Sequence, residues 1–279
     1  MIRKSAIVMC LVLCFLATSK RAQAIQDGKL DGNDHPYVCL IAFFDADGNY
    51  LWRCSGTLIS PDVVLTAAHC TSLPADRAQV FFQTDLEALD IDHRIPNNLL
   101  GHMGDVMPHP DYEEFHGTLP EIHLLPDVGV VLLDEPVLMP EYGELADLGT
   151  LDSLSARAGE PGVTLDVVGY GLQYIRQSPR GVIKLQAERV RYQGEVSIVN
   201  LENALVGDTY LQHTGDNGAG NGAGATSFGD SGGPVFLKGT NKIVALTSWG
   251  FNAQATGPGF AYRVDTLEAQ NFINDALGD

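Results

Sequence analysis

One segment of the chain combines residue types that could carry out covalent catalysis. Residues 228–234 have the sequence Phe-Gly-Asp-Ser-Gly-Gly-Pro. Glycines permit positive φ and let the backbone approach a bound group, so the Ser231 hydroxyl can stand exposed with backbone N–H groups beside it. That combination is a nucleophile next to an oxyanion hole. We therefore predict that Ser231 is a nucleophile, with a glycine-rich hairpin as the alternative.

A serine nucleophile needs a base, and the position of the histidines decides where it comes from. The Gly-x-Ser-x-Gly pattern around Ser231 also matches the nucleophile elbow of α/β-hydrolases, in which the acid and the histidine follow the serine. No histidine follows Ser231 here, whereas His69 comes just after the apolar run 63–65, separated from it by Thr66 and two alanines. An order of His, Asp, Ser is therefore expected.

Asp127 is the candidate for the acid, because it precedes the almost wholly apolar run 128–133. A carboxylate at the mouth of a buried strand is costly unless it has hydrogen-bond donors. A strand-capping role after Pro126 is the alternative. Asp105 and Asp111 also follow the histidine, but neither begins an apolar strand.

The elements that must position these residues are short and β-rich. Turn residues separate the apolar runs, a pattern typical of barrels rather than of helical or α/β folds. The residue types at 45–49 predict a hairpin turn. From Asp265 onward the pattern becomes helical, with a predicted shared face of Leu267, Phe272, Ile273, Ala276 and Leu277. The predicted strands are 37–44, 51–59, 63–65, 80–82, 128–133, 163–168, 182–187, 195–199, 234–237 and 243–249.

The segment 85–125 is the least regular part of the sequence. Its prolines interrupt any continuous helix, so its histidines are interpreted as solvated loop residues rather than as a metal-binding face. Calcium held by the acids at 85–92 is a further alternative. The histidines are His93, His102, His109, His116 and His123, and the acids are Asp85, Glu87, Asp90 and Asp92.

The N-terminus and the composition indicate a secreted protein. Residues 1–24 have two basic residues at 3–4, an apolar stretch at 6–17 and an Ala-Gln-Ala cleavage site, which together predict a signal peptide. Processing at the dibasic pair 20–21 is the alternative. We expect an extracellular location, or a periplasmic one in a bacterium. The 279 residues are 45% hydrophobic and carry a net charge of −18, which argues against nucleic-acid and membrane partners.

With these residues identified, the sequence resembles the trypsin/chymotrypsin family of serine peptidases over essentially all of residues 25–277. The stretches that carry the resemblance are specific in type and order. They are 54–58 with 67–70, the His-Pro-Asp-Tyr at 109–112, Asp127-Val128, Gly169-Tyr170-Gly171, the nucleophile segment 229–234, and Ser248-Trp249-Gly250 with Pro258-Gly259.

The resemblance implies an all-β fold of two antiparallel six-stranded β-barrels, with the active site in the cleft between them and a short C-terminal helix. The peptidase domain would span 25–279, with one barrel at about 25–145 and the other, with the helix, at about 146–279. Within the cleft, His69 would act as the base, Asp127 would orient it, and Ser231 would be acylated.

The resemblance also implies the surroundings of the triad. The N–H groups of Gly229 and Ser231 would form the oxyanion hole. Cys54 and Cys70 would form a disulfide that leaves Cys39 as a buried thiol. No metal or cofactor is expected, and the partners would be polypeptide substrates and protein inhibitors.

The expected substrate pocket has no charge at its base. Relatives that cut after Arg or Lys have Asp where Ala225 stands, so large apolar or aromatic residues are expected before the cleaved bond, with smaller aliphatic ones as the second choice. Glutamate is disfavoured, because Thr247 stands where Glu-specific relatives have histidine. The expected pocket residues are Ala225, Thr226, Ser248, Trp249, Gly250 and Gly259.

Departures from the family pattern leave a second function open. Ser227 replaces a bridging cysteine, Tyr170 replaces a tryptophan, and the stretch from His69 to Asp127 is long. A catalytically silent relative that binds a partner through the same cleft is therefore the alternative to a peptidase.

Activation is expected to follow from removal of the signal peptide. The predicted cleavage after Ala24 would make Ile25 the first residue, and in the family such a new α-amino group pairs with the acid that precedes the nucleophile, here Asp230. Gln26 departs from the family's usual second residue.

Overall fold

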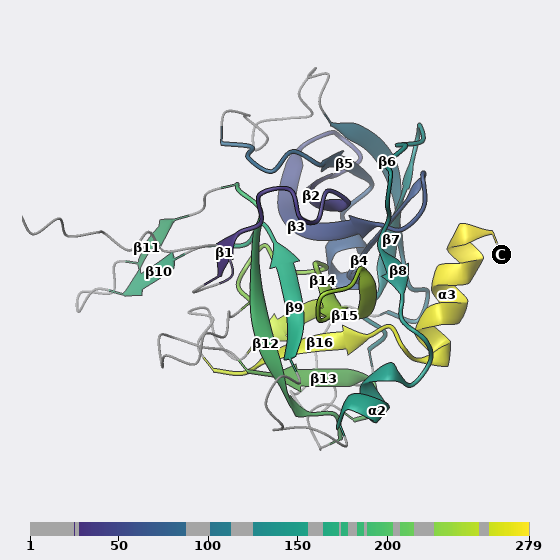
Figure 1. The fold of residues 1–279 in the computed structure, drawn as a ribbon. Coiled ribbons are helices and arrows are strands. Elements are labelled where there is room, and N and C mark those ends of the chain that lie inside the picture. The colour runs from purple at the N-terminus through teal and green to yellow at the C-terminus, as the bar shows by residue number, and fades with distance from the viewer. Residues whose placement is uncertain are drawn as a thin grey trace, which may run out of the picture.

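A computed structural model describes residues 25, 28–87, 101–112, 125–155, 164–172, 174–177, 183–186, 189–202, 207–214, 226–250 and 257–278. The predicted signal peptide lies outside these residues, as does Ala225. The described chain forms two β-barrels that lie one above the other in Figure 1, with a helix beside them. No helix in this part of the chain is long and apolar enough to cross a membrane.

The first barrel is built from antiparallel strands around an apolar core. Every residue of its first strand is buried, and its apolar side chains belong to the hydrophobic core. The strand is paired on both sides. At the predicted hairpin turn, Asp45 Oδ1 accepts hydrogen bonds from the N–H groups of Asp47 (3.0 Å) and Asn49 (2.8 Å). The barrel closes in the order β2 (Val38–Phe44), β3 (Tyr50–Leu58), β4 (Val63–Thr66), β7 (Gly129–Leu133), β6 (His102–Pro108) and β5 (Arg77–Phe81).

The second barrel also has six strands, and its first strand closes it by pairing with the second. Two short strands join its sheet: β1 (Lys29–Leu30) is antiparallel to the second strand and β8 (Glu144–Leu145) is parallel to the fifth. A separate hairpin is formed by β10 (Tyr174–Gln177) and β11 (Ile183–Gln186). The six barrel strands are β9 (Thr164–Gly169), β12 (Tyr192–Asn200), β13 (Tyr210–His213), β14 (Pro234–Leu237), β15 (Lys242–Gly250) and β16 (Gly259–Arg263). The expected all-β, two-barrel fold is confirmed.

The described residues also form three short helices: α1 (Ala68–Thr71), α2 (Thr150–Ser155) and α3 (Leu267–Leu277). The Thr266 side chain caps the start of α3 by accepting from Ala269 N, and Gly278 ends the helix in the left-handed conformation. The C-terminal helix was predicted correctly. Its predicted face was wrong at Leu267, which is 63% exposed, whereas Ala269 is buried with Phe272 and Ile273.

Three barrel strands were not predicted. Strand β6 lies inside the segment predicted to be irregular, because its sequence mixes glycine, proline, histidine and aspartate and its side chains are mostly half-buried. Strands β13 and β16 are only four and five residues long. Their apolar residues do not alternate, so periodicity alone does not identify them.

A buried polar network fastens the two barrels together. Arg191, which directly precedes β12, is fully buried and donates to Asp31 Oδ2 (2.7 Å) and to the carbonyl oxygen of Val38 (2.8 Å) in the first barrel. The Tyr170 hydroxyl donates to the carbonyl oxygen of Gln83 (2.9 Å). These contacts connect the N-terminal segment, β2 and β12, so they fix the interface in which the candidate active site lies.

Candidate active site

His69 lies in α1, the one-turn helix that follows β4. Its backbone N–H donates to Asp127 Oδ1 (2.9 Å), and its Nδ1 lies 2.8 Å from Asp127 Oδ2. Because a carboxylate only accepts, Nδ1 carries the hydrogen. The Nε2 atom is then an acceptor in an imidazole that is 32% exposed, as a general base requires.

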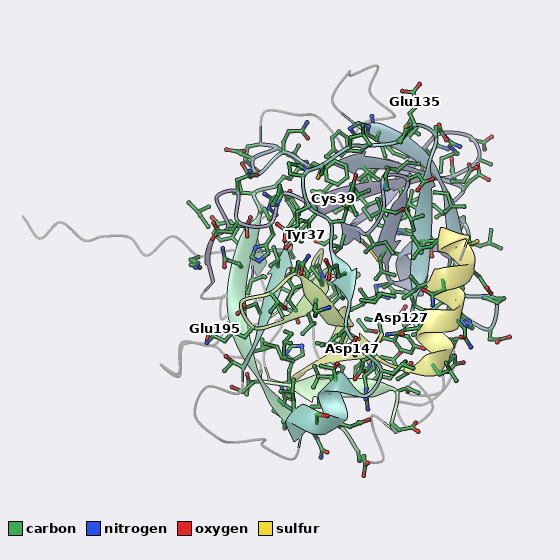
Figure 2. All side chains as sticks on the ribbon, turned by 45° about the vertical axis from the view of Figure 1, so that its right-hand side comes forward. Tyr37, Cys39, Asp127, Glu135, Asp147 and Glu195 are labelled. Carbon is green, nitrogen blue, oxygen red and sulfur yellow. A yellow bond between two sulfur atoms is a disulfide. The ribbon has the colours of Figure 1, made fainter. Side chains whose placement is uncertain are left out.

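Asp127 lies at the mouth of β7, where the two barrels meet (Figure 2). Its side chain is 4% exposed, and the Ser248 hydroxyl of β15 in the second barrel donates to its Oδ2 atom. Burial opposes the charged form, but attraction to His69 and hydrogen bonds from His69 and Ser248 outweigh burial and lower the pKa of Asp127. The donors that the buried carboxylate was predicted to need are present.

The pKa of His69 is set by the same pair. Burial favours the neutral ring, but the charge of Asp127 and the hydrogen bond to it outweigh that effect and raise the pKa of His69. Asp127 therefore both orients the imidazole and stabilises its protonated form.

The Ser231 loop of the second barrel packs directly on the segment that leads into α1. The carbonyl oxygen of Ser231 accepts from Ser55 N (2.8 Å). Gly232 has φ +74°, and a Cβ at this position would lie 2.0 Å from Thr66 Oγ1 and 2.7 Å from Ala67 N. The loop can approach the histidine segment this closely only because residue 232 is glycine.

Gly229 and Ser231 are the residues predicted to form the oxyanion hole. Gly229 has φ +95°, and its carbonyl oxygen accepts from Ser55 Oγ (2.8 Å), which in turn accepts from Tyr170 N (3.0 Å). Among the described residues, neither the Gly229 N–H nor the Ser231 N–H donates a hydrogen bond, and the Ser231 hydroxyl makes none either. Both backbone donors are thus available to a ligand.

Asp230 is buried in a notch made by two glycines. A Cβ at Gly169 or Gly171 would lie 2.3 Å from one of its carboxylate oxygens, which explains the Gly-Tyr-Gly sequence. The carboxylate accepts from Gly171 N (2.8 Å) and Ser227 N (2.8 Å). Burial outweighs these bonds and raises the pKa of Asp230 to about 7.

The expected activation pair is not formed within the described residues. Ile25 is an internal residue of this chain, and its side chain is buried in the core of the second barrel with Ala146 and Leu151. Neither a hydrogen bond nor an ion pair links residue 25 to Asp230 in the described parts.

A pocket of about 190 Å³ opens beside the imidazole. Trp249 lines it and stacks on Phe260, with ring centroids 3.8 Å apart. Three of its lining residues, Tyr112, Leu125 and Tyr210, were not predicted as pocket residues from the sequence. Tyr210 lies on β13, a strand that was not predicted either. The lining residues are His69, Tyr112, Leu125, Asp127, Tyr210, Ser248 and Trp249.

The residues expected to form the substrate pocket are only partly brought together. Gly250 of β15 pairs with Gly259 of β16, and Thr226 Oγ1 would lie 3.1 Å from a Cβ at Gly259. Ser248 instead directs its hydroxyl to Asp127. Ser227, which replaces a family cysteine, donates to the carbonyl oxygen of Leu172 (2.5 Å).

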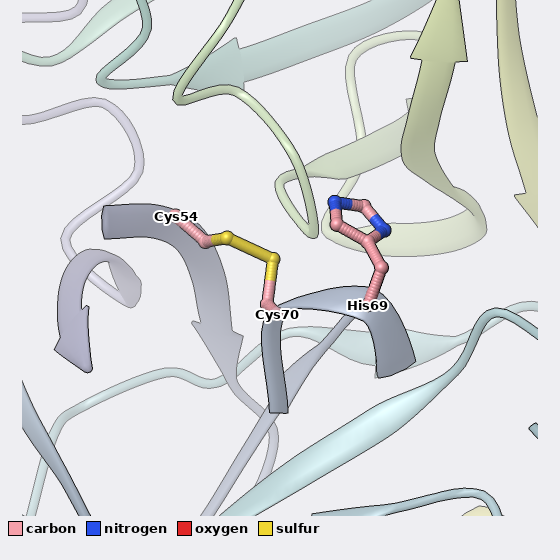
Figure 3. Close-up of side chains that lie close together, drawn as sticks. All are labelled: Cys54, His69 and Cys70. Atoms are coloured by element: carbon pink, nitrogen blue, oxygen red, sulfur yellow. A yellow bond between two sulfur atoms is a disulfide. The ribbon is translucent and has the colours of Figure 1, made fainter. Parts of the chain in front are cut away.

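Cys54, His69 and Cys70 lie close enough together to suggest a metal site, but the two cysteines cannot act as ligands. Side-chain ligand atoms of Cys54, His69 and Cys70 lie within 4.8 Å of one another, but the two cysteines form the expected disulfide (Figure 3). A disulfide offers no thiolate to a metal. Cys39 is buried and free, as expected.

The other candidate metal region is described only at its start. Asp85 Oδ1 accepts from Glu87 N (3.0 Å), and the Glu87 side chain accepts from Arg189 N (2.5 Å), so both acids already have protein donors. The remaining acids of this region, Asp90 and Asp92, and the histidines His93, His116 and His123 lie outside the described residues.

Comparisons with known proteins agree with this geometry. A family model described as Trypsin matches residues 29–273. A trypsin from Saccharopolyspora erythraea is 29% identical over 83% of this chain and 88% of its own length. The Drosophila melanogaster serine protease ea is 25% identical over 82% of this chain, which spans only 59% of that relative. A solved structure of HL collagenase, 17% identical, has the same fold, with a TM-score of 0.64 over 90% of this chain and 98% of its own.

Proposed function

The chain belongs to the trypsin family, and from this premise we propose that it is a secreted serine endopeptidase that cleaves polypeptides through an acyl-enzyme. The observation that carries the proposal is the hydrogen-bonded series Ser248, Asp127 and His69, which joins the two barrels and leaves the imidazole partly exposed. A purely structural network would not need an exposed, oriented imidazole beside a pocket.

In the proposed reaction, His69 Nε2 accepts the proton of the Ser231 hydroxyl as its oxygen attacks the peptide carbonyl carbon. His69 then gives that proton to the leaving amine, and water repeats the sequence to release the acyl group. Asp127 stays ionised throughout and stabilises the imidazolium, in keeping with the lowered pKa of its carboxyl group.

The developing negative charge on the carbonyl oxygen would be bound by the backbone N–H groups of Gly229 and Ser231. One such donor contributes about 2.7–4 kcal/mol to the transition state in a comparable enzyme. The described structure has no hydrogen bond between Ser231 and His69. Such bonds often form only when substrate binds.

We propose a preference for large apolar or aromatic residues at P1, the position on the amino side of the cleaved bond. Thr226 contributes only a hydroxyl to this site, and Gly250 and Gly259 contribute no side chains. Peptides with arginine or lysine at P1 would find no carboxylate among these residues, so cleavage mainly after those residues would contradict the preference.

The competing function is a catalytically silent protein that binds a partner through the same cleft, and the unbonded Ser231 hydroxyl is the observation in its favour.

An organophosphorus reagent distinguishes the peptidase from the silent binding protein. We expect one equivalent to bind covalently at Ser231, as located by peptide mass mapping. Labelling should be lost in Ser231→Ala and in His69→Ala but kept in His102→Ala, which removes a histidine outside the site. An unlabelled, folded wild-type protein would refute the enzyme and favour the binder.

A further inference from the structure

His213, the last residue of β13, carries a fully buried imidazole that the proposed mechanism does not use. Its partner across the antiparallel pair is Gly259 of β16, and paired residues project to the same face of a sheet. A Cβ at Gly259 would lie 2.4 Å from His213 Cε1 and 2.7 Å from its Nε2. The imidazole therefore lies over the surface that the glycine leaves bare.

The hydrogen bonds of His213 fix which of its nitrogens is an acceptor. Nδ1 lies 2.8 Å from the carbonyl oxygen of Thr214, and because a carbonyl only accepts, Nδ1 carries the hydrogen. Burial lowers the pKa of His213, so the ring is neutral near pH 7. Nε2 consequently presents a lone pair.

That lone pair has no donor within the described parts of the chain. A buried acceptor without a donor is unfavourable and uncommon in folded proteins. The Nε2 atom and the Thr226 hydroxyl oxygen lie near the same point above Gly259. They would be 2.7 Å and 3.1 Å, respectively, from a Cβ at that position. Two polar groups from different elements thus converge on one glycine.

The location connects this pair of groups to the proposed active site. Gly259 pairs with Gly250, and the neighbouring pair is Phe260 with Trp249. Trp249 and Ser248 line the pocket beside His69. The His213 acceptor therefore lies against Gly259, one of the residues that the proposed function assigns to the P1 site.

We propose that His213 Nε2 is the hydrogen-bond acceptor of the P1 site and that it selects aromatic side chains with a terminal donor, tyrosine over phenylalanine. The inference rests on the proposed function and narrows its aromatic preference. A phenol O–H would donate to Nε2, and the Thr226 hydroxyl could donate to the phenol oxygen. A phenylalanine ring would leave Nε2 unsatisfied.

The same geometry disfavours an acidic P1 residue. A carboxylate would place acceptor atoms against the neutral acceptor Nε2, and the chain's net charge of −18 adds repulsion. Sites built to bond a substrate hydroxyl discriminate strongly against an analogue that lacks it, because their polar groups are then left unpaired.

The test compares two peptide substrates that differ only in tyrosine or phenylalanine at P1, with active enzyme counted by covalent labelling of Ser231. We expect kcat/KM to favour tyrosine by about tenfold or more. In His213→Phe, which keeps an aromatic ring but has no acceptor, the ratio should fall to about one through loss on the tyrosine substrate. The same substitution in the first barrel, His102→Phe, should leave the ratio unchanged.

A binding measurement separates this inference from the peptidase proposal. Titration of Ser231→Ala with p-cresol and with toluene, followed by ¹⁵N NMR of the His213 imidazole, should show tighter binding of p-cresol and a shift of Nε2. Equal binding of the two compounds would overturn the inference whatever the activity. A wild-type ratio of one, a ratio that persists in His213→Phe, or preferred cleavage after glutamate would also overturn it.

Discussion

Replacement of Gly232 by alanine tests whether the Ser231 loop is held in place by its contact with the histidine segment. Gly232 has φ +74°, and an added Cβ would lie 2.0 Å from Thr66 Oγ1 and 2.7 Å from both Ala67 N and the carbonyl oxygen of Ser55. Two of these three contacts are with backbone of the first barrel, which cannot rotate away. The loop itself must therefore move.

A second glycine supplies the matched control. Gly239, in the turn between β14 and β15, has φ +70°, and a Cβ there would meet nothing within 4 Å. Alanine in the left-handed conformation destabilises the folded state by roughly 1–2 kcal/mol. Alanine also restricts the unfolded chain, which offsets about 0.4–1 kcal/mol of that loss. We expect Gly239→Ala to lower the free energy of unfolding by about 1 kcal/mol. Gly232→Ala adds overpacking of about 1–3 kcal/mol.

The assays are urea unfolding and the rate at which an organophosphorus reagent labels Ser231. A nucleophile displaced by about 1 Å loses roughly a hundredfold in rate, so labelling should slow by about that factor in Gly232→Ala and stay at the wild-type rate in Gly239→Ala. The reasoning is refuted if the two variants have the same stability and the same labelling rate.

Three further predictions concern the cysteines, the N-terminus and Asp230. Mass mapping should find Cys54 and Cys70 joined and Cys39 resistant to iodoacetamide in the native protein, because burial raises the pKa of the Cys39 thiol; rapid native alkylation of Cys39 would contradict this. A form that begins at Ile25 should hydrolyse peptides faster than one extended by two residues, and equal rates would show that Ile25 is not the switch. In the extended form, the folded state keeps the proton of Asp230 up to about pH 7, whereas the unfolded chain loses it near pH 4. The free energy of unfolding should therefore fall by up to about 4 kcal/mol as the pH rises from about 4 to about 7. Asp230→Asn should remove most of this slope in a urea titration repeated across pH, and an unchanged slope would assign it to other groups.

The residue types of the site were predictable because its chemistry is local in sequence. A serine among glycines, a histidine after an apolar strand and an aspartate before another strand each have few interpretations, and His69 is hydrogen-bonded to Asp127 in the structure. The role of Ser248 was not predictable in this way. It was assigned to the pocket wall, and only the pairing of strands in space shows its hydroxyl on Asp127.

The strands that were missed share a physical reason. Strands β6, β13 and β16 obtain their stability from neighbours distant in the chain, since each is paired on both sides, and not from a strong period of their own. Tyr210, which lines the pocket beside His69, was not predicted for the same reason, because it belongs to β13. A site built where strands of two barrels meet is therefore predictable in its reacting groups and less so in its walls.

The two buried carboxylates of the site show how burial can serve opposite purposes. Asp127 has an imidazole as its partner, which lowers the pKa of its carboxyl group and keeps it ionised. Asp230 has two backbone N–H groups, with Arg53 contributing the least to its charge stabilisation, and its pKa rises to about 7. A cation brought to Asp230 would favour the ionised form of this carboxyl group, and the cost of ionising a group that is half-neutral at pH 7 would be offset by the stronger attraction between opposite charges in a buried site. An α-amino group at Ile25 is such a cation, so its arrival at Asp230 should lower that pKa, whereas a chain that keeps its N-terminal extension should retain the raised value.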